Sequence, residues 1–320
     1  MNDPRYVAAR RGLLDALEAL ADHRDSIIVV GAQAVYLRVA GSLPGISAYT
    51  TDGDVAIDSR SLADAPPIGE LMSACFELAR TPSGGPAGPG HWVQTITVGD
   101  RSYPASIDLM VPDGIASEDG RRGARLGAHG EHSARKASGL EAALIDYDWI
   151  EIPDLGEPST RSVEAKVAGP TALLIAKAHK IHDRLEQSAQ LGRLIDKDAS
   201  DVYLLMRNLG AEDAKATVGR LLADPVSADA TQTGLRYLDD QIPLLITDGR
   251  VRDLDGIQNV GKMPFVELDI DNRPDDLYNP SYIAHTALLL KVTDVRIILL
   301  GRAARFISPP SAPPCRPRCP

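Results

Sequence analysis

The sequence predicts an α+β fold, in which a mixed sheet with flanking helices is followed by a helical domain. Residues 26–30 form a short apolar run rich in β-branched residues, typical of a strand buried on both faces, and residues 32–39 then have helical spacing. Residues 92–98 and 103–111 alternate on either side of a Gly99-Asp100 turn, which predicts a hairpin. A strongly helical segment follows Pro170, a residue that suits the first turn of a helix.

The remaining elements of the first 170 residues follow from spacing and composition. Residues 4–24 place four leucines at helical spacing with charges opposite, which predicts an amphipathic helix that covers the sheet. Residues 62–79 have a second helical pattern, and the Gly- and Pro-rich residues 81–90 indicate a flexible loop that could border a substrate. Residues 140–152 and 161–167 are predicted as further strands that close the first domain.

The segment from residue 114 to residue 139 is basic, rich in glycine and poor in apolar residues. Its cations are Arg121, Arg122, Arg125, Arg135 and Lys136. Such a composition predicts a mobile, solvated loop. Because the segment directly follows the second strand of the hairpin, it is also a candidate for contact with phosphate or RNA.

The length of 320 residues allows two modest domains, each with its own core. We expect the sheet domain over residues 1–168 and the helical domain over residues 169–250. Residues 251–306 have no assigned fold, and the proline-dominated residues 307–320 are predicted to be a disordered tail.

The overall composition limits the class of protein. A net charge of -10 argues against non-specific nucleic-acid binding by the whole surface, although it is compatible with a local basic patch. No apolar run is long enough to cross a bilayer and the N-terminal segment lacks a signal-peptide pattern, so we expect a cytoplasmic protein without a membrane partner. Three cysteines are too few and too scattered for a disulfide framework or a zinc site.

Three carboxylates indicate a metal site. Asp52 and Asp54 lead into a predicted strand over residues 55–58, and Asp108 lies within the predicted strand over residues 103–111. Asp52 and Asp54 point to the same side because side chains alternate along a strand, and two like charges held close together are costly unless a cation neutralises them. Asp108 lies between Ile107 and Leu109, where an unpaired carboxylate is expensive. Hard oxygen ligands of this kind suit Mg²⁺ or Mn²⁺ together with the phosphates of a nucleotide.

The turn from the first strand into its helix indicates a place for those phosphates. Gly31 and Ala32 open the helix, whose first backbone N–H groups can bind an anion. An alternative interpretation of residues 50–54 is a polar turn, in which Asp52 is the capping residue and Gly53 supplies the bend. The combination of Gly31 with all three carboxylates favours the metal site.

The predicted helices after residue 170 carry a second charged set. Lys177 and Arg184 are seven residues apart and therefore share one helix face, while Asp198 and Asp201 lie one turn apart at the start of the next helix. The simplest interpretation of the lysine and arginine is a solvated stripe. The neighbouring His179 and His182 are interpreted as surface or capping histidines rather than metal ligands.

Together, Gly31-Ala32 opening a helix, Asp52-x-Asp54 and Asp108 resemble the nucleotidyltransferase fold of the DNA polymerase β superfamily. That superfamily has Gly-Gly or Gly-Ser at the helix start, and Ala32 takes the second place in this chain. The resemblance implies that Asp52, Asp54 and Asp108 bind metal and act in catalysis, and that Gly31 and Ala32 contact the nucleotide.

Over residues 5–240 the chain is more narrowly similar to the AbiEii/AbiGii nucleotidyltransferase toxins. The similarity lies in the helix with Lys177 and Arg184 and in the following Lys197-Asp198-x-x-Asp201. It implies that Lys177 and Arg184 bind the triphosphate and that Asp198 or Asp201 supports catalysis. It further implies transfer of a nucleoside monophosphate from an NTP to an acceptor hydroxyl, with a tRNA 3′ end as acceptor and a cognate antitoxin as partner.

Two other functions remain open at this stage. A nucleotidyltransferase could instead modify a protein or a small molecule such as an aminoglycoside, and an acidic chain would favour a cationic acceptor. The chain could also be a non-catalytic nucleotide-binding module. That function is disfavoured because all three carboxylates are present, and such a set is costly to keep unpaired.

Overall fold

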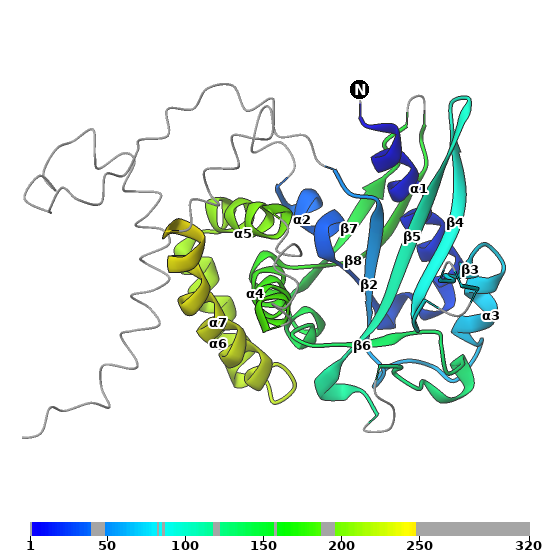
Figure 1. Cartoon of the computed structure of the whole chain (residues 1–320). Coiled ribbons are helices and arrows are strands. Elements are labelled where there is room, and N and C mark those ends of the chain that lie inside the picture. The colour runs from blue at the N-terminus through cyan, green and yellow to red at the C-terminus, as the bar shows by residue number, and fades with distance from the viewer. Residues whose placement is uncertain are drawn as a thin grey trace, which may run out of the picture. The chain divides into compact units, whose positions relative to one another are not determined.

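The structure is a computed structural model that describes residues 2–39, 49–81, 83–84, 87–117, 122–156, 159–186 and 196–247. It confirms an α+β fold, with a mixed eight-stranded sheet flanked by helices (Figure 1). The region expected over residues 251–306 and the tail expected over residues 307–320 lie outside the described residues. None of the described helices has a stretch long and apolar enough to cross a bilayer.

The sheet has the strand order β3-β4-β5-β2-β1-β8-β7, and β6 pairs with β5 off this path. The pairs β2–β5, β1–β8 and β5–β6 are parallel, and the other pairs are antiparallel. The strands are β1 (Ile27–Val30), β2 (Asp52–Ile57), β3 (Glu77–Leu78), β4 (His91–Val98), β5 (Arg101–Pro112), β6 (Arg135–Ala137), β7 (Tyr147–Pro153) and β8 (Ser162–Ala168).

Seven α-helices and four short 3-10 helices are described with this sheet. The α-helices are α1 (Pro4–Ala19), α2 (Gly31–Val39), α3 (Ile68–Ser73), α4 (Pro170–Glu186), α5 (Asp196–Asn208), α6 (Ala211–Ala223) and α7 (Ala228–Thr247). The 3-10 helices are η1 (Ala21–Ser26), η2 (Asp113–Ile115), η3 (Gly127–His129) and η4 (Glu141–Leu144). Figure 1 shows α4 to α7 grouped beside α2, on the side of the sheet away from the β4–β5 hairpin.

Helix α1 covers one face of the sheet, as its leucine spacing predicts. The Asp3 side chain caps the helix by accepting a hydrogen bond from the Arg5 N–H at 2.8 Å, and Leu13, Leu14 and Leu17 are buried. The helix lies so close to β5 that a Cβ atom at Gly12 would approach the Cβ of Ala105 to 2.8 Å. The face of the sheet that carries Ala105 is therefore closed by α1.

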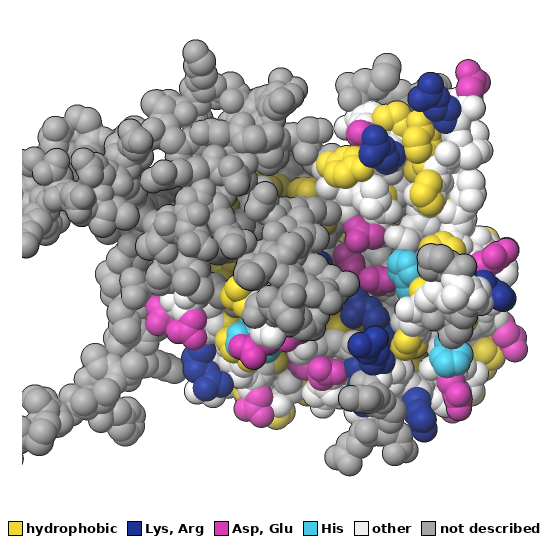
Figure 2. Space-filling model, in the orientation of Figure 1, with side chains coloured by type: hydrophobic (Ala, Val, Ile, Leu, Met, Phe, Trp, Pro, Cys, Tyr) yellow, Lys and Arg dark blue, Asp and Glu magenta, His cyan; other side chains and the backbone are white. Residues whose placement is uncertain are grey.

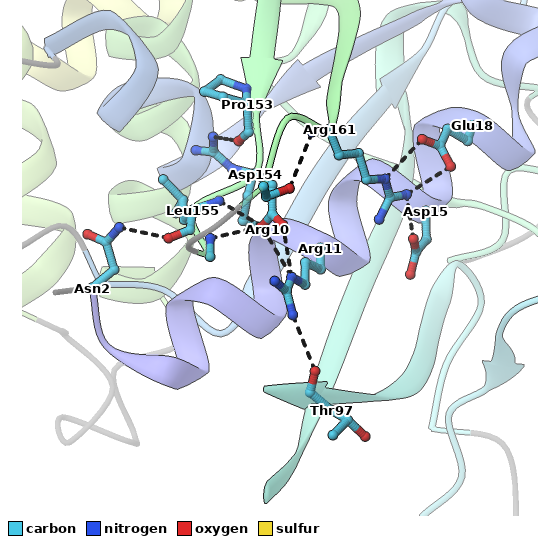
Figure 3. A network of polar contacts seen from close by, with 12 residues as sticks. Asn2, Arg10, Arg11, Asp15, Glu18, Thr97, Pro153, Asp154, Leu155 and Arg161 are labelled. Atoms are coloured by element: carbon cyan, nitrogen blue, oxygen red, sulfur yellow. Dashed lines mark hydrogen bonds and ion pairs between the residues drawn. The ribbon is translucent and has the colours of Figure 1, made fainter. Parts of the chain in front are cut away.

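Charged contacts fix α1 against the ends of the strands (Figure 3). Arg11 Nε donates to Asp154 Oδ2 at 3.0 Å, directly after β7. On the next turn of the helix, Arg161 Nη2 donates to Asp15 at 2.6 Å and to Glu18 at 2.8 Å. These contacts tie the helix to the β7–β8 end of the sheet.

Three segments differ from the sequence prediction. The helix expected over residues 62–79 is confined to α3, because Pro66 and Pro67 precede it and residues 77–78 pair with β4 as β3. The strand expected over residues 140–152 begins with η4, whose apolar residues are buried on a helical turn; a short apolar run fits either structure. The loop expected from residue 114 to residue 139 contains η2, η3 and β6.

Candidate functional site

The junction of β1 and α2 places Asp54 against a glycine. Val30 pairs with Asp54 across β1 and β2, and Gly31 then has a φ of +67°. A Cβ atom at Gly31 would overlap the Asp54 carboxylate, so only glycine allows this close approach. Ala32 follows in the first turn of α2 and is buried.

The three predicted carboxylates, here called the carboxylate cluster, lie on neighbouring strands. Asp54 is directly opposite Asp108 in the parallel β2–β5 pair, and Asp52 lies two residues earlier on the same side of β2. The Asp52 carboxylate accepts a hydrogen bond from the Thr50 hydroxyl. Between the two aspartates of β2, a Cβ atom at Gly53 would meet Ile107 and Leu13, so the carboxylate cluster faces away from α1.

Asp54 is the electrostatically strained member of the carboxylate cluster. Burial raises the pKa of Asp54 to about 6, and the negative charges of Asp52 and Asp108 add to this rise. The positive charges of Lys180 and Lys177 oppose it. The charged form of Asp54 is therefore favoured by any further cation that reaches it.

Asp108 has a different environment because both of its carboxylate oxygens are engaged. His91 Nδ1 lies 2.6 Å from Oδ1, and Arg135 Nη2 donates to Oδ2 at 3.2 Å. Burial opposes the charge of Asp108, but the His91 hydrogen bond and the Arg135 charge outweigh burial and lower the pKa of Asp108. In turn, the hydrogen bond to Asp108 raises the pKa of His91.

Asp54 also lines a cavity of about 590 Å³, which we call the cationic cavity. Its wall contains Val30 and Gly31 on the sheet side. Among the described residues, the basic side chains in its lining are Arg122, Arg135, Lys136, Lys177, Lys180 and Arg184, and the acidic ones are Asp54, Asp113 and Asp183. Figure 2 shows acidic side chains in the middle of the drawn face with basic side chains directly below them. Such a wall fits a ligand with several negative charges.

Lys177 is held in this wall by two aspartates of α5. Its Nζ lies 3.1 Å from Asp198 Oδ1 and 2.5 Å from Asp201 Oδ2, and Arg184 also forms an ion pair with Asp198. The side chains of Lys177, Asp198 and Asp201 are each at most 6% exposed. Asp198 and Asp201 are not among the described lining residues of the cavity, so in this geometry they position the cations of α4.

Lys180 is a cavity residue that the sequence analysis did not single out. It follows Lys177 by three residues, and this spacing alone places both on one face of α4. Burial and the neighbouring charge of Lys177 lower the pKa of Lys180, whereas Asp54 raises it. His91 is a further residue of the site that was not singled out. Arg122, Arg135 and Lys136 were expected only as part of a basic loop that could contact phosphate, and all three line the cavity.

The histidines of α4 lie apart from the carboxylate cluster. His179 is buried, so the expectation of a surface or capping histidine is wrong for this residue. Its Nε2 lies 2.8 Å from the Ala230 carbonyl oxygen, and its ring packs edge-on against Tyr237. His182 stacks on the same tyrosine at 3.6 Å between ring centroids. Both therefore join α4 to α7.

The carboxylate cluster fits a hard divalent cation in its chemistry. It offers three oxygen-donor side chains, and a cation there would offset the burial and the neighbouring negative charges that raise the pKa of Asp54. Within the part of the chain that the structure describes, however, no three His, Cys, Asp or Glu side chains converge closely enough to hold a metal ion. The contacts of Asp108 with His91 and Arg135 explain why its oxygens do not converge with those of Asp52 and Asp54.

Comparisons of the chain with known proteins found no match. No model of a known protein family matches the chain, and neither the curated proteins nor the solved structures contain a match. A functional proposal must therefore rest on the residues of the carboxylate cluster and the cationic cavity.

Proposed function

We propose that the chain is a metal-dependent nucleotidyltransferase, which moves a nucleoside monophosphate from an NTP to an acceptor hydroxyl. The observation that carries this proposal is the position of Asp54. Its half-buried carboxylate lies beside two others and has a pKa raised to about 6, and it also lines a cavity rich in lysine and arginine. A candidate site for a divalent cation would thus adjoin a candidate site for a polyanion, which is the combination that a metal-bound triphosphate requires.

The cationic cavity would bind the triphosphate of the donor. Lys177 and Arg184 are oriented by Asp198, and Lys180 lies on the same helix face between them. These groups would neutralise the charge that accumulates on the leaving pyrophosphate. The open start of α2 at Gly31 would contribute backbone N–H groups to the same phosphates.

The carboxylate cluster would hold Mg²⁺ or Mn²⁺ and act on the acceptor. A divalent cation bound there supplies charge neutralisation between the phosphates and the attacking oxygen. Asp54 and Asp52 would be its ligands on β2. Asp108 stays ionised because its pKa is lowered, which suits sharing a second cation. The alternative role, accepting the proton of the attacking hydroxyl, would require that its pKa rise when His91 or Arg135 leaves it.

The acceptor and the partner follow from the resemblance to AbiEii/AbiGii toxins. We propose that the acceptor is the 3′ end of a tRNA and that a cognate antitoxin restrains the enzyme. These two assignments depend on the catalytic proposal, but they can be wrong while that proposal is right. Transfer to another hydroxyl compound would use the same carboxylate cluster.

The test is incubation of the purified protein with each of four α-labelled NTPs, Mg²⁺ and total tRNA. Label on tRNA is expected from the wild type and not from Asp54→Asn, which removes the charge but keeps the shape of the side chain. Asp229→Asn, an exposed change on α7, is the matched control and should transfer as the wild type does. Equal transfer by Asp54→Asn would overturn the metal site, and label on protein or a small molecule would replace only the acceptor.

A further inference from the structure

Arg135 belongs to both halves of the site. Its position is fixed by the parallel pairing of β6 with β5, where Arg135 lies opposite Met110. From there its guanidinium donates to Asp108 Oδ2 at 3.2 Å, and the side chain also lines the cationic cavity. Asp108 is two residues from Met110 on β5 and opposite Asp54 on β2. One arginine therefore reaches from the cavity wall to the carboxylate cluster.

The pairing leaves Asp108 little capacity for another cation. His91 engages Oδ1 at 2.6 Å while Arg135 engages Oδ2. A carboxylate whose two oxygens already accept charge-assisted hydrogen bonds must give up one of them to become a ligand of a hard cation. Of the two partners, Arg135 is the one that also lines the cationic cavity, where an anionic ligand would compete for it.

The two side chains can separate at modest cost. The Arg135 side chain is 36% exposed and the Asp108 side chain 22% exposed, so water can solvate both groups when they part. The pair therefore lacks the full burial that makes an ion pair most expensive to break from one side. A phosphate group offers Arg135 more negative charge and a bidentate geometry, and it would therefore compete well with Asp108.

We propose that Arg135 couples the two sites, in that a phosphate bound in the cationic cavity draws the guanidinium away from Asp108 and frees Oδ2 as a cation ligand. This inference rests on the proposed function, because it assumes a polyphosphate in the cavity and a cation at the carboxylate cluster. Coupling of this kind is reciprocal, so the cation raises the affinity for the polyphosphate by the same factor. Arg135 is thereby a positioning residue, and it acts through Asp108.

The test measures Mn²⁺ affinity without nucleotide, from the free Mn²⁺ signal in electron paramagnetic resonance. Arg135→Gln should bind Mn²⁺ about threefold more tightly than the wild type, because Asp108 loses a competing cation. Arg122→Gln removes the same charge from the same cavity, but Arg122 has no recorded contact with Asp108 in the described structure. This control should show a clearly smaller gain, and Arg135→Lys should lie between Arg135→Gln and the wild type.

The second measurement adds a non-hydrolysable NTP analogue. In the wild type and in Arg122→Gln the analogue should raise the Mn²⁺ affinity by more than it does in Arg135→Gln, where the competitor is already absent. Equal Mn²⁺ affinities of Arg135→Gln and Arg122→Gln without nucleotide would overturn the coupling while leaving the nucleotidyltransferase proposal intact. A wild type that binds neither Mn²⁺ nor the analogue would overturn both.

Discussion

Lys177 and Asp201 form a buried ion pair that joins α4 to α5, with 2.5 Å between Nζ and Oδ2. Asp198 binds the same ammonium group at 3.1 Å, so one lysine neutralises two buried carboxylates. Removing Lys177 leaves Asp198 with Arg184 as a partner but takes the ammonium group from Asp201, and a buried charge that loses its partner is expensive. The residue that would bind the triphosphate is therefore also a structural residue.

Lys177→Ala is accordingly expected to lower the free energy of unfolding by about 3 kcal/mol, because the buried Asp201 loses its ammonium partner while Asp198 keeps Arg184. Urea denaturation at neutral pH measures this loss. Lys215→Ala, an exposed change on α6, should cost less than about 0.5 kcal/mol. If both variants lost equally little, Lys177 would not be part of a buried ion pair, and its assignment to the cavity wall would fall with it.

Asp54 should make the protein less stable at neutral pH than in weak acid. The folded protein keeps the Asp54 proton up to a pKa of about 6, whereas an aspartic acid in the unfolded chain loses it near its ordinary pKa of 3.8. Between these values the folded state binds more protons, so the free energy of unfolding falls as pH rises, by up to about 3 kcal/mol in total.

Asp54→Asn tests this dependence because it removes the titrating group. Urea denaturation from pH 4 to pH 7 should show a smaller decline for Asp54→Asn than for the wild type, and the variant should be the more stable protein at pH 7. A parallel decline in both proteins would mean that other groups cause it. Added Mg²⁺ should stabilise the wild type more than the variant.

The local parts of the site could be predicted from the sequence because each depends on a few neighbouring residues. Strand periodicity predicts the strand before Gly31, the shared orientation of Asp52 and Asp54, and a place for Asp108 within a strand. The structure confirms all three, although Asp108 is half-buried. Lys177 and Arg184 share one face of α4, as their spacing predicts. The interpretation of this face as a solvated stripe is wrong for Lys177, which is buried and paired with Asp198 and Asp201.

His91 was missed although the sequence contains a signal for it. A two-residue turn at Gly99-Asp100 pairs Val98 with Arg101, and this register continued along the hairpin places His91 opposite Asp108. Arg135 could not be found in this way. Its place next to Asp108 depends on β6 adding to β5 in parallel, and nothing in a glycine-rich basic segment predicts a strand.

His91 is expected to titrate at a higher pH than an ordinary histidine, because the hydrogen bond to Asp108 stabilises the imidazolium form and raises the pKa of His91. An NMR titration of the imidazole signals in metal-free buffer measures this pKa. Asp108→Asn should shift it downward, and Asp100→Asn at the exposed hairpin turn should leave it in place. An unchanged titration in Asp108→Asn would show that the two side chains do not pair in solution.

Alanine substitutions at Gly31 and Gly99 distinguish the cost of a strained backbone conformation from the cost of steric overlap with a neighbouring side chain. Both have a positive φ, +67° at Gly31 and +62° at Gly99, so alanine at either position pays about 1 kcal/mol for its backbone conformation. An added Cβ at Gly99 meets nothing within 4 Å, whereas at Gly31 it overlaps the Asp54 carboxylate. Gly31→Ala should therefore lose clearly more stability than Gly99→Ala in urea denaturation, and it should also weaken Mn²⁺ binding by displacing Asp54.

Combining Gly31→Ala with Asp54→Gly should recover part of the lost stability but none of the Mn²⁺ binding. Equal losses in the two single variants would place Asp54 away from the start of α2.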